Sequence, residues 1–414
     1  MPALKINTEY AASFGAYWMI YAIAGSFASV FMLAKGYSNM QIGMTLSAAN
    51  LLALALQPFI ADHADVSAGI RIIDSLILLT LVMMLTGCGF FAFSGGSLLL
   101  AAVFVIILAI HAVLQPLLNT LAFRLSESGT KVSFSIGRAG GSLGFSLILA
   151  VLGTLIEKRG VMAVPVCTEA TCALFIALLL ILKRSFIRLR ATSAKGIVCT
   201  DEADPEGGRR DETERIDLRD FIRRNRIFFI MNLGIAGLFY SNFMLTNYMA
   251  QIAGNVGGTT EQIGRILSLM AFAEMPTMFF FDGIRKHFSG RTLLKAAALG
   301  FTAKIVICWL GRSVGILFAA QAFQLVAFAL FMPAMVYYTD EIMSPGEAVK
   351  GQALFTMMIV FSSIIAGLTG GWILDTLGVR ALTGISALVT SAGAAVVIMT
   401  VDKVKSHRKA ANEI

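Results

Sequence analysis

The sequence predicts an all-α membrane protein with 12 transmembrane helices in two six-helix bundles. Its apolar residues fall into about twelve long blocks. At 1.5 Å per residue, about 20 apolar residues cross a hydrocarbon core of about 30 Å. Hydrophobic residues make up 57% of the chain and charged residues 14%, and the mean hydropathy is +0.78. Those values exclude an ordinary soluble domain. One charged tract, near residues 183–226, divides the blocks six and six.

Each block is assigned as one membrane span, with limits good to a few residues. The spans are placed at 13–34, 40–61, 72–93, 97–123, 132–156, 162–182, 227–250, 261–284, 292–311, 314–338, 350–373 and 380–401. One lysine and no small-residue cleavage pattern precede the first block, which favours a span over a cleaved signal peptide. The loops are short, so successive helices are expected to run antiparallel.

The basic residues predict the topology. If the N-terminus is cytoplasmic, the inner tails and loops carry 25 of the 33 lysines and arginines. Arg138 and Lys304 lie inside spans, and six basic residues lie outside: Lys35, Lys158, Arg159, Arg265, Arg312 and Arg380. Because inner loops are enriched in Lys and Arg, both termini are predicted to be cytoplasmic in an inner (plasma) membrane protein. The net charge of +8 is then explained without a nucleic-acid partner.

The predicted organisation is an N-terminal bundle over 1–182, a cytoplasmic linker over 183–226 and a C-terminal bundle over 227–414. The linker mixes acidic and basic residues densely, which is typical of a solvated segment. Six spans, a linker and six spans are typical of transporters built from nested repeats, whose sites lie at mid-membrane between the halves.

Several other functions are excluded by missing motifs. The chain has no P-loop lysine motif, no GxSxG and no HExxH, and no channel-type filter sequence. Its five cysteines show no metal-binding spacing. We therefore expect neither an enzyme nor a bound metal or cofactor.

Ionisable groups deep in a membrane are costly, so each is a functional candidate. Five lie deep in the spans: His111, Arg138, Glu169, Glu274 and Lys304. Glu274 and Lys304 lie at similar depth, roughly 15 and 18 Å along neighbouring antiparallel spans. An ion pair between them is expected because it lowers the cost of burying either charge. The pair either locks the bundle or faces a cavity and couples transport to protons.

Arg138 lies in a glycine-rich stretch that lets a neighbouring helix or a ligand approach closely. Asn119 lies at about the same depth on the preceding span, and Phe145 lies two turns further along. A guanidinium and an amide suit hydroxyl or carbonyl recognition, and the ring suits stacking. The alternative is that Arg138 extends to the membrane interface.

Each of the other polar residues has two possible roles, one functional and one structural. His111 is a candidate proton carrier or a hydrogen-bonded packing residue. Glu169 is a candidate proton carrier or a carboxyl satisfied by nearby threonine hydroxyls. Asn242 and Gln324, on spans 7 and 10, either bind a polyhydroxyl ligand or join helices to one another.

Several segments resemble one family. Gln41-Ile42-Gly43, Gln57-Pro58 and Asp65 resemble the end of its second helix, and the stretch from Arg138 to Phe145 resembles its fifth helix. Ala273-Glu274-Met275-Pro276 resembles its eighth helix, and Gly367, Gly370, Gly371, Asp375 and Gly378 its eleventh. The chain is thereby similar to the major facilitator superfamily, and within it to the lactose-permease-like sugar and nucleoside proton symporters.

The resemblance implies roles for named residues. Arg138, Phe145 and Glu274 take sugar-recognising places, Lys304 takes the place of an arginine, and Asp65 takes a gating place. Asn119 puts an amide where the family has a carboxylate, and Asn242 lies near a family aspartate. Gln324 and Ala327 take the places of the family's histidine and proton-carrying glutamate, so Glu274, Glu169 or His111 would carry the proton.

The expected function is secondary active transport of a small polar solute, coupled to protons, with a sugar or glycoside as the first candidate and a nucleoside as the second. The alternatives are efflux of amphipathic compounds, a facilitator without coupling, or a sensor that signals through the linker. The expected partners are the solute, a proton and the lipid bilayer, and the protein is expected to be a monomer.

Overall fold

The structure is a computed structural model that describes residues 2–66, 69–93, 95–126, 132–194, 218–343 and 345–404. The first half of the chain forms α1 (Pro2–Ala24), α2 (Ala28–Ala34), α3 (Asn39–Val66), α4 (Gly69–Gly87), α5 (Gly89–Ala92), α6 (Leu98–Ser126), α7 (Phe134–Arg159) and α8 (Ala163–Ala194). The second half forms α9 (Leu218–Arg224), α10 (Arg226–Asn247), α11 (Met249–Gly254), α12 (Thr260–His287), α13 (Gly290–Leu310), α14 (Val314–Gln321), the 3₁₀ helix η1 (Ala322–Leu325), α15 (Phe328–Ile342) and α16 (Pro345–Thr400).

The described helices confirm a membrane protein with twelve spans. Eleven helical stretches are long and apolar enough to cross a membrane. The last of them, Glu347–Thr400, contains Gly378 at φ 81°, a left-handed conformation that favours glycine. The helix direction changes there, so this stretch supplies two spans. Each of the predicted spans overlaps one of these helices.

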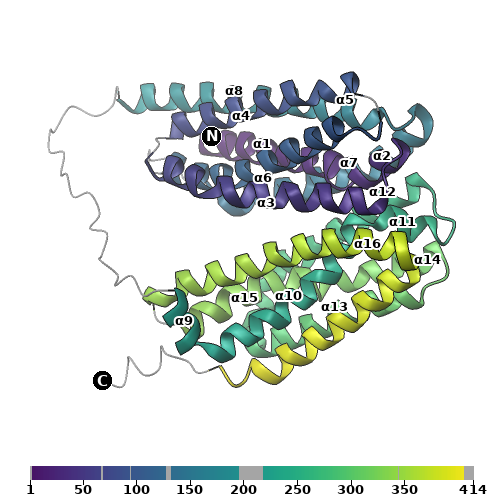
Figure 1. Ribbon diagram of the computed structural model, residues 1–414. Helices are drawn as coiled ribbons and strands as arrows, with labels where there is room; N and C mark the ends of the chain where they lie inside the picture. Colours follow the sequence, from purple (N-terminus) through teal and green to yellow (C-terminus); the bar gives the residue numbers. More distant parts are fainter. Residues whose placement is uncertain are drawn as a thin grey trace, which may run out of the picture.

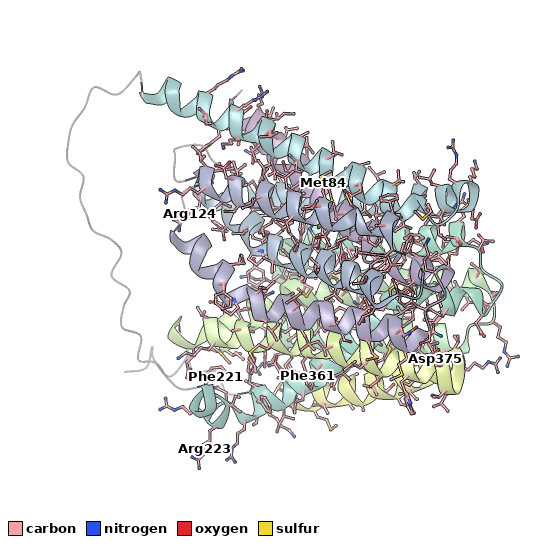
Figure 2. All side chains as sticks on the ribbon, turned by 45° about the horizontal axis from the view of Figure 1, so that its top comes forward. Met84, Arg124, Phe221, Arg223, Phe361 and Asp375 are labelled. Atoms are coloured by element: carbon pink, nitrogen blue, oxygen red, sulfur yellow. The ribbon has the colours of Figure 1, made fainter. Side chains whose placement is uncertain are left out.

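The helices gather into two groups (Figure 1). Helices α1 to α8 form one group and α9 to α16 the other, with α12 packed against α7. Figure 2 labels Arg124 and Phe221 at one end of the molecule and Asp375 at the opposite end. We call these the Arg124 end and the Asp375 end. The two helix groups lie farther apart at the Arg124 end than at the Asp375 end (Figure 1).

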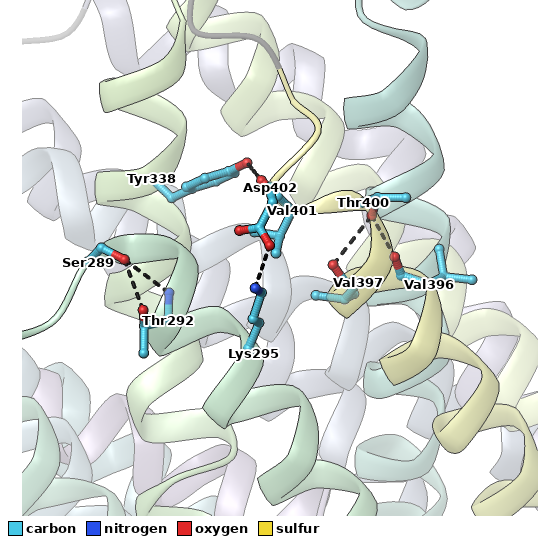
Figure 3. Close-up of polar contacts among 9 residues, drawn as sticks. All are labelled: Ser289, Thr292, Lys295, Tyr338, Val396, Val397, Thr400, Val401 and Asp402. Carbon is cyan, nitrogen blue, oxygen red and sulfur yellow. Dashed lines mark hydrogen bonds and ion pairs between the residues drawn. The ribbon is translucent and has the colours of Figure 1, made fainter.

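Each half is fastened at the Arg124 end by an ion pair between its third and sixth spans. In the first half, Lys183 of α8 pairs with Asp74 of α4. In the second half, Lys295 of α13 pairs with Asp402, just after α16, at 2.5 Å (Figure 3). In the first half the acidic residue comes from the third span and the lysine from the sixth, whereas in the second half the lysine comes from the third span and the acidic residue follows the sixth. Both pairs are partly exposed, so each contributes at most about 1 kcal/mol.

The two halves meet closely at the Asp375 end because small residues face one another there. A side chain at Gly43 of α3 would collide with the carbonyl oxygen of Gly367 of α16. A Cβ at Gly264 of α12 would lie 2.6 Å from the carbonyl oxygen of Leu149 and 3.2 Å from the amide nitrogen of Gly153, both on α7. Small residues allow this approach of helix backbones in membranes.

Two carboxylates reinforce this contact. Asp375, near the end of the fifth span of the second half, accepts hydrogen bonds from the backbone amides of Asn39 (3.1 Å) and Met40 (2.8 Å), at the start of α3. Glu157, near the end of the fifth span of the first half, accepts a hydrogen bond of 2.9 Å from the amide of Glu261, at the start of α12. Each half thus caps the second span of the other half, where free amides and the helix dipole favour negative charge.

Candidate functional site

Glu274, Gln324 and Lys304 form a buried hydrogen-bonded chain in the second half. Nε2 of Gln324 donates to Oε1 of Glu274 at 2.8 Å, and Nζ of Lys304 donates to Oε1 of Gln324 at 2.6 Å. Lys304 is 2% exposed and Gln324 is 1% exposed. The sequence predicted an ion pair between Glu274 and Lys304, but among the described residues Gln324 lies between the two charges and they form no direct ion pair. An amide offers both a donor and an acceptor, so Gln324 serves both charges at once.

A break in the tenth span places Gln324 between the two charges. Helix α14 ends at Gln321, η1 follows, and α15 begins at Phe328. Ala327, between them, has a ψ of −99° and is not helical. The break lies against Gly300 of α13, where a Cβ would be 2.9 Å from the amide nitrogen of Ala327. Because Gly300 precedes Lys304 by one helical turn, the same close approach brings Gln324 within reach of Lys304.

Arg138 of the first half lies level with Glu274. Helices α7 and α12 pack against each other and run antiparallel, and the hydroxyl of Ser268 donates to the carbonyl of Ser146 at 2.8 Å. From this contact, Arg138 and Glu274 lie eight and six residues away in the same direction, toward the Arg124 end. Their charges interact across the interface. Glu274 therefore faces a cation from each half, Lys304 and Arg138.

Aromatic residues of α1 surround Arg138. The Cζ atom of Arg138 lies 5.9 Å from the centre of the Trp18 ring. The Phe145 ring lies 6.2 Å from Trp18 and 6.4 Å from Tyr21, and it is stacked on the latter. Sequence reasoning predicted Phe145 but missed Trp18 and Tyr21. The available signal was the helical spacing of aromatic residues along the first span.

The glycine-rich face of α7 is covered by α1 rather than left open. A Cβ at Gly137 would collide with the Tyr10 ring, and one at Gly141 would lie 2.5 Å from the Trp18 ring and 2.9 Å from that of Phe14. Of the two readings of these glycines, a neighbouring helix is the one observed. The glycines bring the aromatic residues of α1 close to Arg138.

His111 is held by packing in the first half. Its ring stacks on Tyr17, with ring centres 4.1 Å apart, and lies 5.3 Å from Tyr21. Nε2 of His111 lies 3.0 Å from the carbonyl oxygen of Tyr17, and the Tyr17 hydroxyl donates to the carbonyl of His111 at 2.9 Å. This is the arrangement expected of a hydrogen-bonded packing residue.

Glu169 lies apart from the Glu274 chain. It belongs to α8 and abuts Gly87 of α4, and α4 packs against α6 and α8. Its Oε1 is buried without a hydrogen-bond partner among the described residues. The expected satisfaction by threonine hydroxyls is not observed there, since the hydroxyl of Thr168 donates to the carbonyl of Val164 instead.

Two predicted amides retain unsatisfied oxygens. Oδ1 of Asn119 on α6 and Oδ1 of Asn242 on α10 are buried without a hydrogen-bond partner in the described part of the chain. Buried polar atoms usually have partners, so such atoms are candidates for contact with a ligand or water. The side chain of Asp65, the predicted gating residue, lies outside the described residues.

Comparison with known proteins gives matches over nearly the whole chain. The model of the MFS_1 like family matches residues 11–404. The Bacillus subtilis "Uncharacterized transporter YwbF" is 23% identical over 417 residues, which cover 95% of this chain and 94% of that protein. The Deinococcus radiodurans "Putative sugar efflux transporter" is 25% identical over 123 residues, which cover only 30% of this chain and 31% of that protein.

A solved structure shows the same fold. A mutant of the nucleoside transporter NupG aligns with a TM-score of 0.73 over 96% of this chain and 99% of that chain, at 14% identity. At that identity the likeness shows the fold alone. The predicted all-α fold of twelve membrane helices in two bundles and the resemblance to the major facilitator superfamily are thereby confirmed.

Proposed function

Since the chain belongs to the MFS_1 like family, we propose that it is a secondary transporter of a small polar solute, with its binding site between the two halves. The observation that carries this proposal is the Glu274–Gln324–Lys304 chain, which lies opposite Arg138 and Trp18 of the other half. Buried charges are costly in a membrane, and here they gather at one level on facing helices.

We propose a sugar or glycoside as the solute, with a nucleoside as the second candidate. The carboxylate of Glu274 accepts hydrogen bonds from hydroxyls, and the guanidinium of Arg138 donates to ring or carbonyl oxygens. Trp18 and Phe145 offer rings for stacking on an apolar face of the solute. The unsatisfied oxygens of Asn119 and Asn242 add acceptors on either half.

Glu274 is our proposed proton carrier. As a carboxylate it is matched by Gln324 and by the two cations that face it. A proton on Glu274 removes that charge, turns an acceptor into a donor, and so changes which hydroxyls the site holds. His111 takes no part in this proposal because Tyr17 engages its ring. Glu169 lies elsewhere, between α4 and α8, and would carry a proton only by a separate route.

Alternating access requires the Asp375 end to open. The caps formed by Asp375 and Glu157 join the halves only when that end is closed, so they favour the closed state. We propose that the Arg124 end is cytoplasmic and that the protein lies in the plasma membrane, and the positive-inside rule supports this orientation. In this orientation the described state is closed to the outside, and the two halves rock around the site.

Uptake by purified protein in proteoliposomes tests the proposal. Labelled monosaccharides, glycosides and nucleosides are offered with and without an inward proton gradient. Saturable uptake of one class, accumulated only with the gradient, is expected. Equilibration without accumulation would support a facilitator, and transport of none of these classes would contradict the assignment of a hydroxyl-rich solute.

Export is the second candidate for the direction of transport. One relative, of which 31% matches this chain, is named a putative sugar efflux transporter. Loading the solute inside the vesicles and reversing the gradient separates export from uptake. Transport of amphipathic drugs with no competition from sugars would favour the efflux alternative that the sequence left open.

A further inference from the structure

Two arginines line one pocket at the Asp375 end of the second half. The pocket has a volume of about 160 Å³. Arg312 follows α13, and Arg380 begins the last span just after Gly378. Asn255 follows α11 and Trp309 lies in the last turn of α13, and both also line the pocket. Three segments that are distant in the sequence therefore contribute two arginines, an asparagine and a tryptophan to one lining.

Within the described residues, the charge of this pocket has no acidic partner. No acidic residue lines it, and within the described residues neither arginine forms an ion pair. Asp375, five residues before Arg380, is engaged by the amides of Asn39 and Met40 at the contact between the halves. Both arginines are exposed, and an anion bound between them would interact favourably with both charges.

The pocket also lies beside a surface that suits lipid. Trp309 is 46% exposed and the adjacent Leu310 is 63% exposed. Leu388, one turn after the Gly384 that lies against the Trp309 ring, is 73% exposed. Tryptophan is enriched where hydrocarbon meets the polar headgroups, because its ring is apolar and its N–H is polar. Exposed leucines beside it offer a path for acyl chains.

We propose that this pocket binds a phosphate group, supplied either by a lipid headgroup or by a soluble phosphate. Guanidinium groups bind phosphate oxygens through paired N–H donors, and two of them match a group that exposes two or more oxygens. The amide of Asn255 and the indole N–H of Trp309 are the neutral donors within the same lining. The site is independent of the proposed solute site, which lies toward mid-membrane.

A phosphate bound in this pocket would contact residues from three places: the end of α11, the end of α13, and the start of the last span, just after the break in α16. Gly378 leaves the backbone free to turn before Arg380, so an anion that holds Arg380 beside Arg312 restrains this turn. Stabilisation of the folded protein by the ligand is the direct consequence.

Thermal unfolding of the delipidated full-length protein tests the proposal. The probes are phosphatidylglycerol, inorganic phosphate, and diacylglycerol, which has the chains without the phosphate. Phosphatidylglycerol is expected to raise the Tm and diacylglycerol is not. In R312Q/R380Q the gain is expected to disappear, with binding weakened about tenfold or more, which corresponds to about 1.4 kcal/mol.

The matched control is K158Q/R159Q, which removes two exposed basic residues at the same end, in the last turn of α7. It should keep the full gain. If R312Q/R380Q is not recovered folded, R380Q alone should still lose at least half of the gain. A native mass spectrum of the same samples should show bound lipid in the wild type and in K158Q/R159Q but not in R312Q/R380Q.

The probes separate the two sources. A gain with phosphatidylglycerol alone identifies the headgroup, and an arginine-dependent gain with inorganic phosphate identifies a soluble phosphate. An equal gain with diacylglycerol, an equal gain in R312Q/R380Q and the wild type, or no gain with either phosphate-bearing probe would overturn the proposal.

Discussion

Lys304 donates a hydrogen bond of 2.6 Å to Oε1 of Gln324, so a lysine buried in a membrane span is matched by an amide rather than directly by a carboxylate. The same amide donates to Glu274 through its other end. The two charges are therefore linked through a neutral group that can turn. Such a link leaves the carboxylate of Glu274 able to contact a ligand that binds between the halves. A direct ion pair with Lys304 would engage that carboxylate instead.

Replacement of Gln324 by leucine should be strongly destabilising. Q324L leaves Lys304 and Glu274 buried without the amide that matches both, at a cost of about 3 kcal/mol. The control is Q321L, one turn earlier in the same span. Gln321 is equally buried, but its amide donates only to the carbonyl of Leu317 in its own helix. Thermal unfolding of both variants measures the difference, and equal losses would contradict the account of Gln324.

Asp375→Asn should shift the protein toward the state that is open at the Asp375 end. The amide retains only one of the two oxygens that accept the backbone N–H groups, and it loses the charge that the α3 N-terminus favours, worth about 0.3–1 kcal/mol. That corresponds to a change of about two- to fivefold in the population of the closed state. Spin labels across the α3–α16 contact report the distance between the halves.

Adding Glu157→Gln to D375N should add to this shift, because the two caps lie on separate helix pairs. The control is D402N, which removes a partly exposed acid paired with Lys295 within one half at the opposite end. The distance distribution should be unchanged in D402N. A wild-type distribution in D375N/E157Q would show that the carboxylates do not hold the halves together.

Gly141→Val should displace α1 from α7. Its side chain would push against the rings of Trp18 and Phe14, which a Cβ alone approaches within 3 Å. Overpacking of this kind costs about 1–3 kcal/mol. The control is G283A on α12, where a Cβ meets nothing within 4 Å and alanine favours the helix. Thermal unfolding should show a loss for G141V and none for G283A.

Trp18→Leu should weaken solute binding by about tenfold while leaving the fold intact, since a stacking ring beside Arg138 is lost. W372L is the control, because Trp372 is half exposed and has no ring contact with another described aromatic residue of the site. The KM for the transported solute, measured in proteoliposomes, should rise in W18L alone. An unchanged KM in W18L would show that Trp18 does not contact the solute.

Much of the fold was predictable because a bilayer imposes long apolar helices and penalises buried charge. That constraint located the twelve spans and pointed to Glu274, Lys304 and Arg138. The break at η1 was not predictable. Residues 321–327 contain neither glycine nor proline, the usual causes of a helix break. The bridging place of Gln324 depends on that break.

The contacts between the halves were also not predictable from the sequence. Asp375 and Met40 are 335 residues apart, and their hydrogen bond depends on how two separately packed bundles meet. The aromatic residues of α1 were missed for a different reason. Trp18 and Tyr21 follow the helical spacing of an ordinary packing face, and only the glycines of α7 bring that face to Arg138.

The central claim is that Glu274 links solute binding to a proton, and accumulation of solute by E274Q proteoliposomes tests it most directly. With a proton gradient imposed, the wild type should accumulate solute, and E274Q should exchange solute across the membrane without accumulating it. E169Q, which changes a buried carboxyl that lies apart from the site, should accumulate normally. Accumulation by E274Q at the wild-type level would contradict the claim.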